Sequence, residues 1–166
     1  MIILGIDPGY AIVGWGVVSY DNYKFKPLGY GALTTPADMP FENRLLEIHS
    51  GLEQIIEKYN PQVMAIEKLY FGTNHTTAID VAQARGVTVL AAAKAGLKIY
   101  EYTPMQVKQA VTGYGKAEKK QMMEMTKRLL GLQAVPKPDD TADALAMAIC
   151  HGHCSGSRLR ELYAAK

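Results

Sequence analysis

The chain begins with a short apolar segment that ends in a carboxylate, IILGID at residues 2–7, and Pro8 and Gly9 follow it. An unbroken aliphatic run of this length, bounded by turn residues, is typical of a buried β-strand. Pro8 and Gly9 turn the chain away from the sheet, so the Asp7 side chain emerges where the strand ends. The segment therefore predicts a central strand with an acid at the rim of the core.

The rest of the sequence supplies the partners of this strand. Two further strands are expected over residues 12–20 and 25–33, joined by a hairpin at Asp21-Asn22. The remaining apolar patterns predict a helix over 41–59, a strand over 63–67, a helix over 76–94, a strand over 97–102 and helices over 103–111, 118–130 and 140–154. This order predicts an α/β fold, with a five-stranded mixed sheet flanked by helices on both faces.

Composition places the chain among ordinary compact domains. It has 166 residues, of which 48% are hydrophobic and 20% charged, and this excludes a disordered or coiled-coil protein. We expect one domain over residues 1–155 and a short C-terminal tail, 156–166, which is a candidate for disorder. The sequence has no segment typical of a signal peptide or a membrane span. Its two cysteines, Cys150 and Cys154, do not form a secreted disulfide framework, so we predict a cytoplasmic protein.

Four acids are candidates for a metal site. Asp7 and Glu67 each end an apolar strand, and Asp140 and Asp143 lie three residues apart at the start of the last helix. Converging carboxylates repel one another unless a cation lies between them, and a set of oxygen ligands favours Mg²⁺ or Mn²⁺. Each acid also has an ordinary interpretation, as a turn former, a helix N-terminal acid or a partner of a lysine, and spacing alone leaves this open.

Basic residues gather in the third quarter of the chain. The formal net charge is only +2, which does not by itself indicate a nucleic-acid-binding protein. Between residues 105 and 128, however, the only acids are Glu118 and Glu124, and the basic residues are Lys108, Lys116, Lys119, Lys120, Lys127 and Arg128. The alternative interpretation of this region is a solvated helix surface.

Five segments together resemble those of the RuvC family of Holliday-junction resolvases, in the same order and with similar spacing. They are ILGIDPG at 3–9, AIE at 65–67, QARG at 83–86, QVKQ at 106–109 and DTADALA at 140–146. The resemblance, which covers residues 2–153, implies a ribonuclease-H-like fold. It also implies a metal-dependent crossover junction endodeoxyribonuclease that acts as a homodimer in recombination and DNA repair. Such an enzyme resolves four-way DNA junctions by paired symmetric nicks.

The resemblance also assigns roles to individual residues. It makes Asp7, Glu67, Asp140 and Asp143 the catalytic and metal-binding acids, with two Mg²⁺ ions per active site that Mn²⁺ can replace. It places Tyr70, with Phe71 beside it, where the family stacks an aromatic ring on an unpaired base; the family often has phenylalanine where this chain has Tyr70. It makes Lys108 and Lys119 functional lysines near the scissile phosphate. Lys116 and Lys120 fit the surrounding DNA-binding surface less specifically.

Partners follow from the same resemblance, and the same residues also admit competing functions. The helix over 76–94 is the main dimer contact of the family, and a RuvA/RuvB-type junction-binding platform and branch-migration motor are the expected partners. The role of Arg85, in the QARG segment, stays open. A GIDPG strand followed by a hairpin also resembles actin-like ATPases, which need two such domains. Ribonuclease H and a nucleic-acid-binding module without catalytic activity are also competing functions. Cys150, His151, His153 and Cys154 look like zinc ligands, but their spacing on a helix argues against a shared ion.

Overall fold

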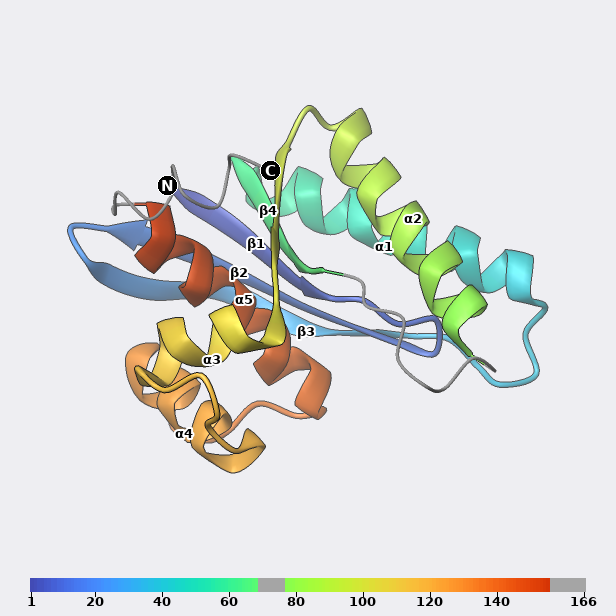
Figure 1. Ribbon diagram of the computed structural model, residues 1–166. Helices are drawn as coiled ribbons and strands as arrows, with labels where there is room; N and C mark the ends of the chain where they lie inside the picture. Colours follow the sequence, from blue (N-terminus) through green and yellow to red (C-terminus); the bar gives the residue numbers. More distant parts are fainter. Residues whose placement is uncertain (69–76, 156–166) are drawn as a thin grey trace.

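The computed structural model describes residues 1–68 and 77–155 and contains one five-stranded mixed sheet in the order β3-β2-β1-β4-β5 (Figure 1). β1, β2 and β3 form an antiparallel meander, whereas β1 pairs with β4 and β4 with β5 in parallel. The strands are β1 (Ile2–Asp7), β2 (Ile12–Asp21), β3 (Lys24–Thr34), β4 (Val63–Glu67) and β5 (Lys98–Tyr102). The predicted five-stranded mixed sheet is confirmed.

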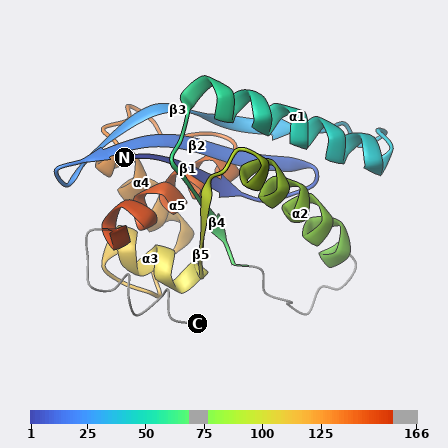
Figure 2. The same cartoon turned by 90° about the horizontal axis from the view of Figure 1, so that it is seen from above.

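Helices cover both faces of this sheet (Figures 1 and 2). One face is covered by α1 (Phe41–Tyr59) and α2 (Ala78–Lys94), and the other by α3 (Pro104–Thr112), α4 (Lys119–Leu129) and α5 (Asp139–Ser155). A separate apolar core fills each side. Leu4, Ile6 and Ile66 belong to the core under α1 and α2, and Ile3, Ala65 and Leu145 to the core around α5. Alternate residues of β1 and β4 thus point to opposite cores, as a period of two requires.

The element boundaries agree with the predicted ones to within two residues. The hairpin between β2 and β3 turns at Asn22 and Tyr23, one residue later than expected, and both have left-handed φ angles of 45° and 62°. Positive φ at both central residues is what a two-residue hairpin loop of type I′ needs. The predicted tail, 156–166, lies outside the described residues. Within the described ranges, no helix is both long and apolar enough to cross a membrane.

Helix α5 lies directly on β1 and β2 because glycines face it. A Cβ atom at Gly5 would overlap the main-chain carbonyl of Ala144, and one at Gly14 would overlap the main chain of Asp140. Gly14 is the register partner of Asp7 on the neighbouring strand. The first turn of α5 therefore approaches the sheet beside the end of β1, where Asp7 emerges.

We expect Gly14→Ala to destabilise the protein, because the added methyl group meets main-chain atoms that cannot rotate away. Overpacking of this kind costs about 1–3 kcal/mol, and for a chain of this size that lowers the melting temperature by several degrees. Gly115→Ala is the matched control, since the nearest atom to its Cβ would be Cγ of the exposed Met105 side chain, at 3.0 Å. Thermal denaturation compares the two; equal losses would contradict the proposed contact.

Candidate active site

Asp7 and Glu67 end adjacent parallel strands at the same edge of the sheet. Ile6 of β1 is the register partner of Ile66 of β4, so the next residue on each strand is an acid. Burial raises the pKa of Glu67, and the carboxylate of Asp143 adds to this. The carboxyl ends of parallel strands are where α/β sheets place their ligands. The two acids therefore lie at the position expected of a functional site.

The first two turns of α5 bring the other two acids to Asp7. The pKa of Asp7 is raised from 3.8 to about 8, chiefly by burial and then by the charges of Asp143, Glu67 and Asp140, while Lys119 acts in the opposite direction. Burial also raises the pKa of Asp143. All four acids thus belong to one electrostatically coupled cluster with Asp7 at its centre.

A cavity of about 270 Å³ opens at this cluster. Three of the four acids line it, together with the two lysines expected near the scissile phosphate, and Asp140 does not. The charged lining residues are Asp7, Glu67, Asp143, Lys108 and Lys119, and the others are Pro104, Val107, Met122, Ala146 and Met147. The cavity therefore combines a carboxylate cluster, two cations and apolar walls supplied by α3, α4 and α5.

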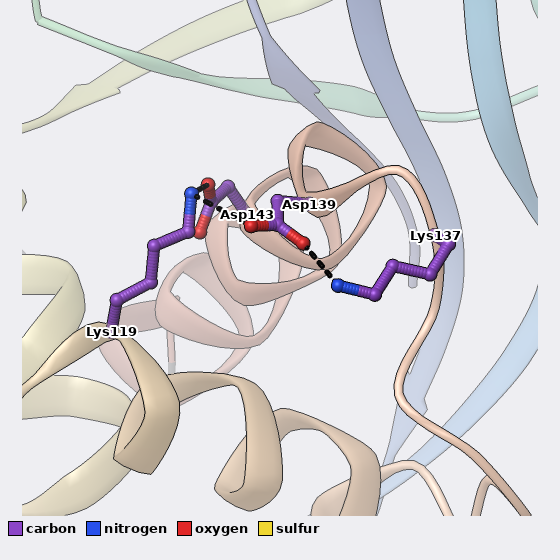
Figure 3. A network of polar contacts seen from close by, with 4 residues as sticks. All are labelled: Lys119, Lys137, Asp139 and Asp143. Atoms are coloured by element: carbon purple, nitrogen blue, oxygen red, sulfur yellow. Dashed lines mark hydrogen bonds and ion pairs between the residues drawn. The ribbon is translucent and has the colours of Figure 1, made fainter.

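Lys119 forms ion pairs with two carboxylates of α5 (Figure 3). Its Nζ atom is 3.2 Å from Oδ2 of Asp143 and 3.5 Å from Oδ2 of Asp139, and Lys137 reaches the other oxygen of Asp139 at 2.7 Å. Partial burial works against the charged ammonium, but the two carboxylates outweigh it and raise the pKa of Lys119. Lys119 is therefore a firmly charged cation that neutralises part of the acid cluster.

The chemistry of this donor set fits a divalent metal. Asp7, Glu67 and Asp143 all have pKa values raised by burial, so the site favours a compensating positive charge. Oxygen-only ligands suit Mg²⁺ or Mn²⁺. In the side-chain arrangement of residues 1–68 and 77–155, no three His, Cys, Asp or Glu side chains lie close enough to hold one ion together.

The other expected DNA contacts fall in different places. Tyr70 and Phe71 lie outside the described residues. Lys116 is exposed between α3 and α4. Lys120 lines a second, open hollow of about 450 Å³ between the end of α3 and α4, which Tyr114, Gln121 and Arg128 also line. Lys119 and Lys120 are consecutive residues of α4, but they line different hollows, and of the two only Lys119 faces the acids.

Three of the residues that look like zinc ligands on α5 each contact a different residue elsewhere in the fold. His151 is buried, and its Nδ1 atom lies 2.8 Å from the hydroxyl oxygen of Tyr102. His153 Nδ1 lies 2.8 Å from the carbonyl oxygen of Ala110. Cys150 Sγ lies 3.8 Å from the carbonyl oxygen of Gln106. These groups pack α5 against β5 and α3.

Two residues at the site make contacts that the sequence did not predict. Asp139, which was not among the four candidate acids, forms an ion pair with Lys119. Arg85, whose role was open, donates from Nε to the carbonyl oxygen of Glu67 at 3.4 Å and pairs with Glu101. The only sequence signal for Arg85 is its place in the QARG segment, and the sequence offers no sign of which residues it contacts.

Comparisons with known proteins agree with this geometry. The sequence model of the family described as crossover junction endodeoxyribonuclease RuvC matches residues 3–151. A crossover junction endodeoxyribonuclease RuvC from Ruminiclostridium cellulolyticum is 58% identical over 153 residues, which are 92% of either chain. The structure of Thermus thermophilus RuvC superposes with a TM-score of 0.87 at 34% identity, covering 94% of this chain and 96% of that one.

A second solved structure includes a nucleic acid. T. thermophilus RuvC in complex with a Holliday junction substrate superposes with a TM-score of 0.86 at 32% identity, again covering 94% of this chain and 96% of that one. The fold of the present chain is therefore ribonuclease-H-like, as the sequence resemblance predicted.

Proposed function

Because the chain belongs to the RuvC family of crossover junction endodeoxyribonucleases, we propose that it resolves four-way DNA junctions with the acid cluster around Asp7. The observation that carries the proposal is the cavity in which Asp7, Glu67 and Asp143 face Lys108 and Lys119. A carboxylate cluster beside two cations suits the hydrolysis of a phosphodiester, which needs a metal for the reacting oxygens and positive charge for the phosphate. Members of this family are metal-dependent nucleases.

The four acids would hold the metal, and the residues around them prepare the site for it. Asp7, which is buried at the centre of the cluster, would hold the ions together with Glu67, Asp140 and Asp143. When bound, two Mg²⁺ ions supply an activated water and stabilise the attacking and leaving oxygens. Mn²⁺, with the same oxygen preference, would substitute. The apolar walls of the cavity limit the water around the acids.

Lys119 would change partners as the site fills. It pairs with Asp143 and Asp139 in the structure, and it would give up the contact with Asp143 when that carboxylate serves as a metal ligand. The ammonium of Lys119 would then be free to contact a DNA phosphate while Asp139 still holds it from one side. Lys108, which also lines the cavity, would contact the same strand, and Lys116 and Lys120 would contact phosphates farther from the cut.

A cleavage assay on a synthetic four-way junction with a mobile core tests the proposed function. We expect symmetric nicks in two opposite strands with Mg²⁺ or Mn²⁺ and none with EDTA, read on a denaturing gel. A linear duplex of the same sequence is the substrate control. Cleavage of the duplex as fast as the junction would contradict junction selectivity and favour a DNA endonuclease without structure selectivity.

Tyr70→Ala is expected to weaken cleavage more than junction binding. An aromatic ring stacked on an unpaired base contributes about 1–3 kcal/mol, and the resemblance places that contact at the opened crossover, where the cut is made. Tyr70→Phe keeps the ring and should keep the rate. Single-turnover cleavage and gel-shift binding are compared for both variants; an unchanged rate for Tyr70→Ala would remove this residue from the mechanism.

We also propose that α2 forms a homodimer contact. Ile79 and Leu90 on this helix expose 68% and 53% of their surfaces, and both are apolar. An isologous dimer would present two equivalent active sites to a junction of matching symmetry. A junction-binding platform and a branch-migration motor of the RuvA/RuvB type would act on the same DNA.

The dimer is tested by Leu90→Lys, which we expect to give monomers, because the new charge would be buried in the contact. Leu46→Lys on α1 is the control, since Leu46 is also exposed, at 63%. Sedimentation at micromolar concentration gives the state of each variant. A wild-type monomer under these conditions would contradict the proposal.

A further inference from the structure

Arg85 connects α2 to the strand ends that carry the active site. Its side chain is only 16% exposed, and an arginine this buried is normally paired. Its Nε atom donates to the carbonyl oxygen of Glu67, at 3.4 Å, and its guanidinium forms an ion pair with the carboxylate of Glu101 on β5. One planar group therefore binds the last residue of β4 and an acid of the neighbouring strand.

The peptide group after Glu67 is held at both ends. Its carbonyl oxygen accepts from Arg85, and its N–H, which belongs to Lys68, donates to the carbonyl oxygen of Tyr102 at 2.9 Å. Tyr102 is also the register partner of Glu67 on β5. The sheet therefore holds the N–H of this peptide group, and Arg85, which lies on α2, holds its carbonyl oxygen.

Arg85 and the Glu67 carboxylate act from opposite faces of the sheet. The Glu67 side chain lines the cavity together with residues of α3, α4 and α5, whereas α2 covers the other face (Figure 2). Arg85 is therefore not among the residues that line the cavity, and its guanidinium does not face the acid cluster. It fixes the backbone from which the Glu67 carboxylate projects.

We propose that Arg85 is a positioning residue for Glu67: it binds the end of β4 to β5 from behind the sheet and so sets the direction in which the carboxylate enters the cavity. The inference rests on the proposed role of Glu67 as a metal ligand. A carboxylate whose backbone is fixed needs less reorganisation to hold an ion, and partners of this kind are worth about 10–100-fold in metal affinity or activity.

Arg85→Lys is the decisive variant. Lysine keeps the positive charge beside Glu101 but lacks the fork that reaches two acceptors at once. Glu101 is 46% exposed, so water can solvate it and the variant is expected to fold. Arg85→Gln removes the positive charge as well. Glu101→Gln weakens the ion pair that holds the guanidinium in place but leaves Arg85 unchanged. Lys94→Gln is the matched control, because Lys94 also lies on α2 and pairs with Glu53, at 2.8 Å, away from the site.

The measurement is Mn²⁺ binding in the absence of DNA, followed by the loss of the free ion's electron paramagnetic resonance signal. For Arg85→Lys we expect a dissociation constant raised about 10-fold, an effect in the same direction but smaller for Glu101→Gln, and none for Lys94→Gln. Junction affinity in Ca²⁺ and the oligomeric state should stay as in the wild type. Raising Mg²⁺ should restore part of the cleavage rate of Arg85→Lys.

Two results would overturn the inference. One is wild-type Mn²⁺ affinity in folded Arg85→Lys and Glu101→Gln, even if their melting temperatures fall, because Arg85 would then only stabilise the fold. The other is a cleavage defect that Mg²⁺ does not relieve and that follows the loss of dimers. A wild-type protein that binds Mn²⁺ but does not cut junctions would instead refute the proposed function, and the Mn²⁺ titrations would still decide the role of Arg85.

Discussion

Asp7→Asn abolishes cleavage of the four-way junction and leaves junction binding intact or improved: this is the largest effect that we expect from one substitution. Asp7 is the acid to which the other three are coupled. An amide in its place is a weaker metal ligand without charge, and the loss of about 4 kcal/mol of metal-supplied stabilisation lowers the rate about 10³-fold. Binding does not suffer, because one negative charge is removed from a surface that receives phosphates.

The control for Asp7→Asn is Asp21→Asn, the same change at an exposed position at the end of β2. It should cut and bind like the wild type. Single-turnover cleavage in Mg²⁺ and gel-shift binding in Ca²⁺ separate the two functions. If Asp7→Asn lost binding and cleavage together, the cluster would be a DNA-contact or folding element and its assignment as the metal site would be wrong.

The sequence predicted the sheet well because its signals are local. The apolar run before Asp7 and the one before Glu67 each define a strand and place an acid at its end. The stripe over residues 41–59 defines α1 to the residue. Thr103 caps the N-terminus of α3 and forms a capping box with Gln106, a pattern contained within four residues. Features of this kind need no knowledge of the tertiary fold.

The contacts inside the site could not be read in the same way. Lys119 meets Asp143 only because α4 packs beside the first turns of α5, and Arg85 meets Glu67 only because α2 lies over the end of β4. Nothing in the spacing of these residues predicts the pairs. Lys119 and Lys120 are adjacent and alike in sequence, yet they face different hollows. The helical period shows that they diverge, but only the packing shows which of them reaches the acids.

The stability of the metal-free protein should fall as pH rises. The pKa of Asp7 is raised from 3.8 to about 8, first by burial and then by Asp143, Glu67 and Asp140. In the unfolded chain this carboxyl ionises near its ordinary value, so the folded state binds an extra proton between these two pH values. Its contribution to stability is therefore fully present below about pH 4 and is lost as pH rises through about 8. At about 1.4 kcal/mol per pH unit, the whole window is worth on the order of 5 kcal/mol.

Asp7→Asn should remove this dependence, because an amide has no proton to lose. In EDTA at pH 9 we expect the variant to be more stable than the wild type by several kcal/mol, and at pH 4 the difference should nearly vanish. Mg²⁺ should raise wild-type stability at pH 9 by binding the ionised cluster in the folded state, and it should do much less for the variant. Urea unfolding at both pH values, with and without Mg²⁺, gives these free energies. If the unfolding free energies of the wild type and the variant changed in parallel from pH 4 to 9, folding would not disfavour the ionised form of Asp7. The acids would then not need a compensating cation.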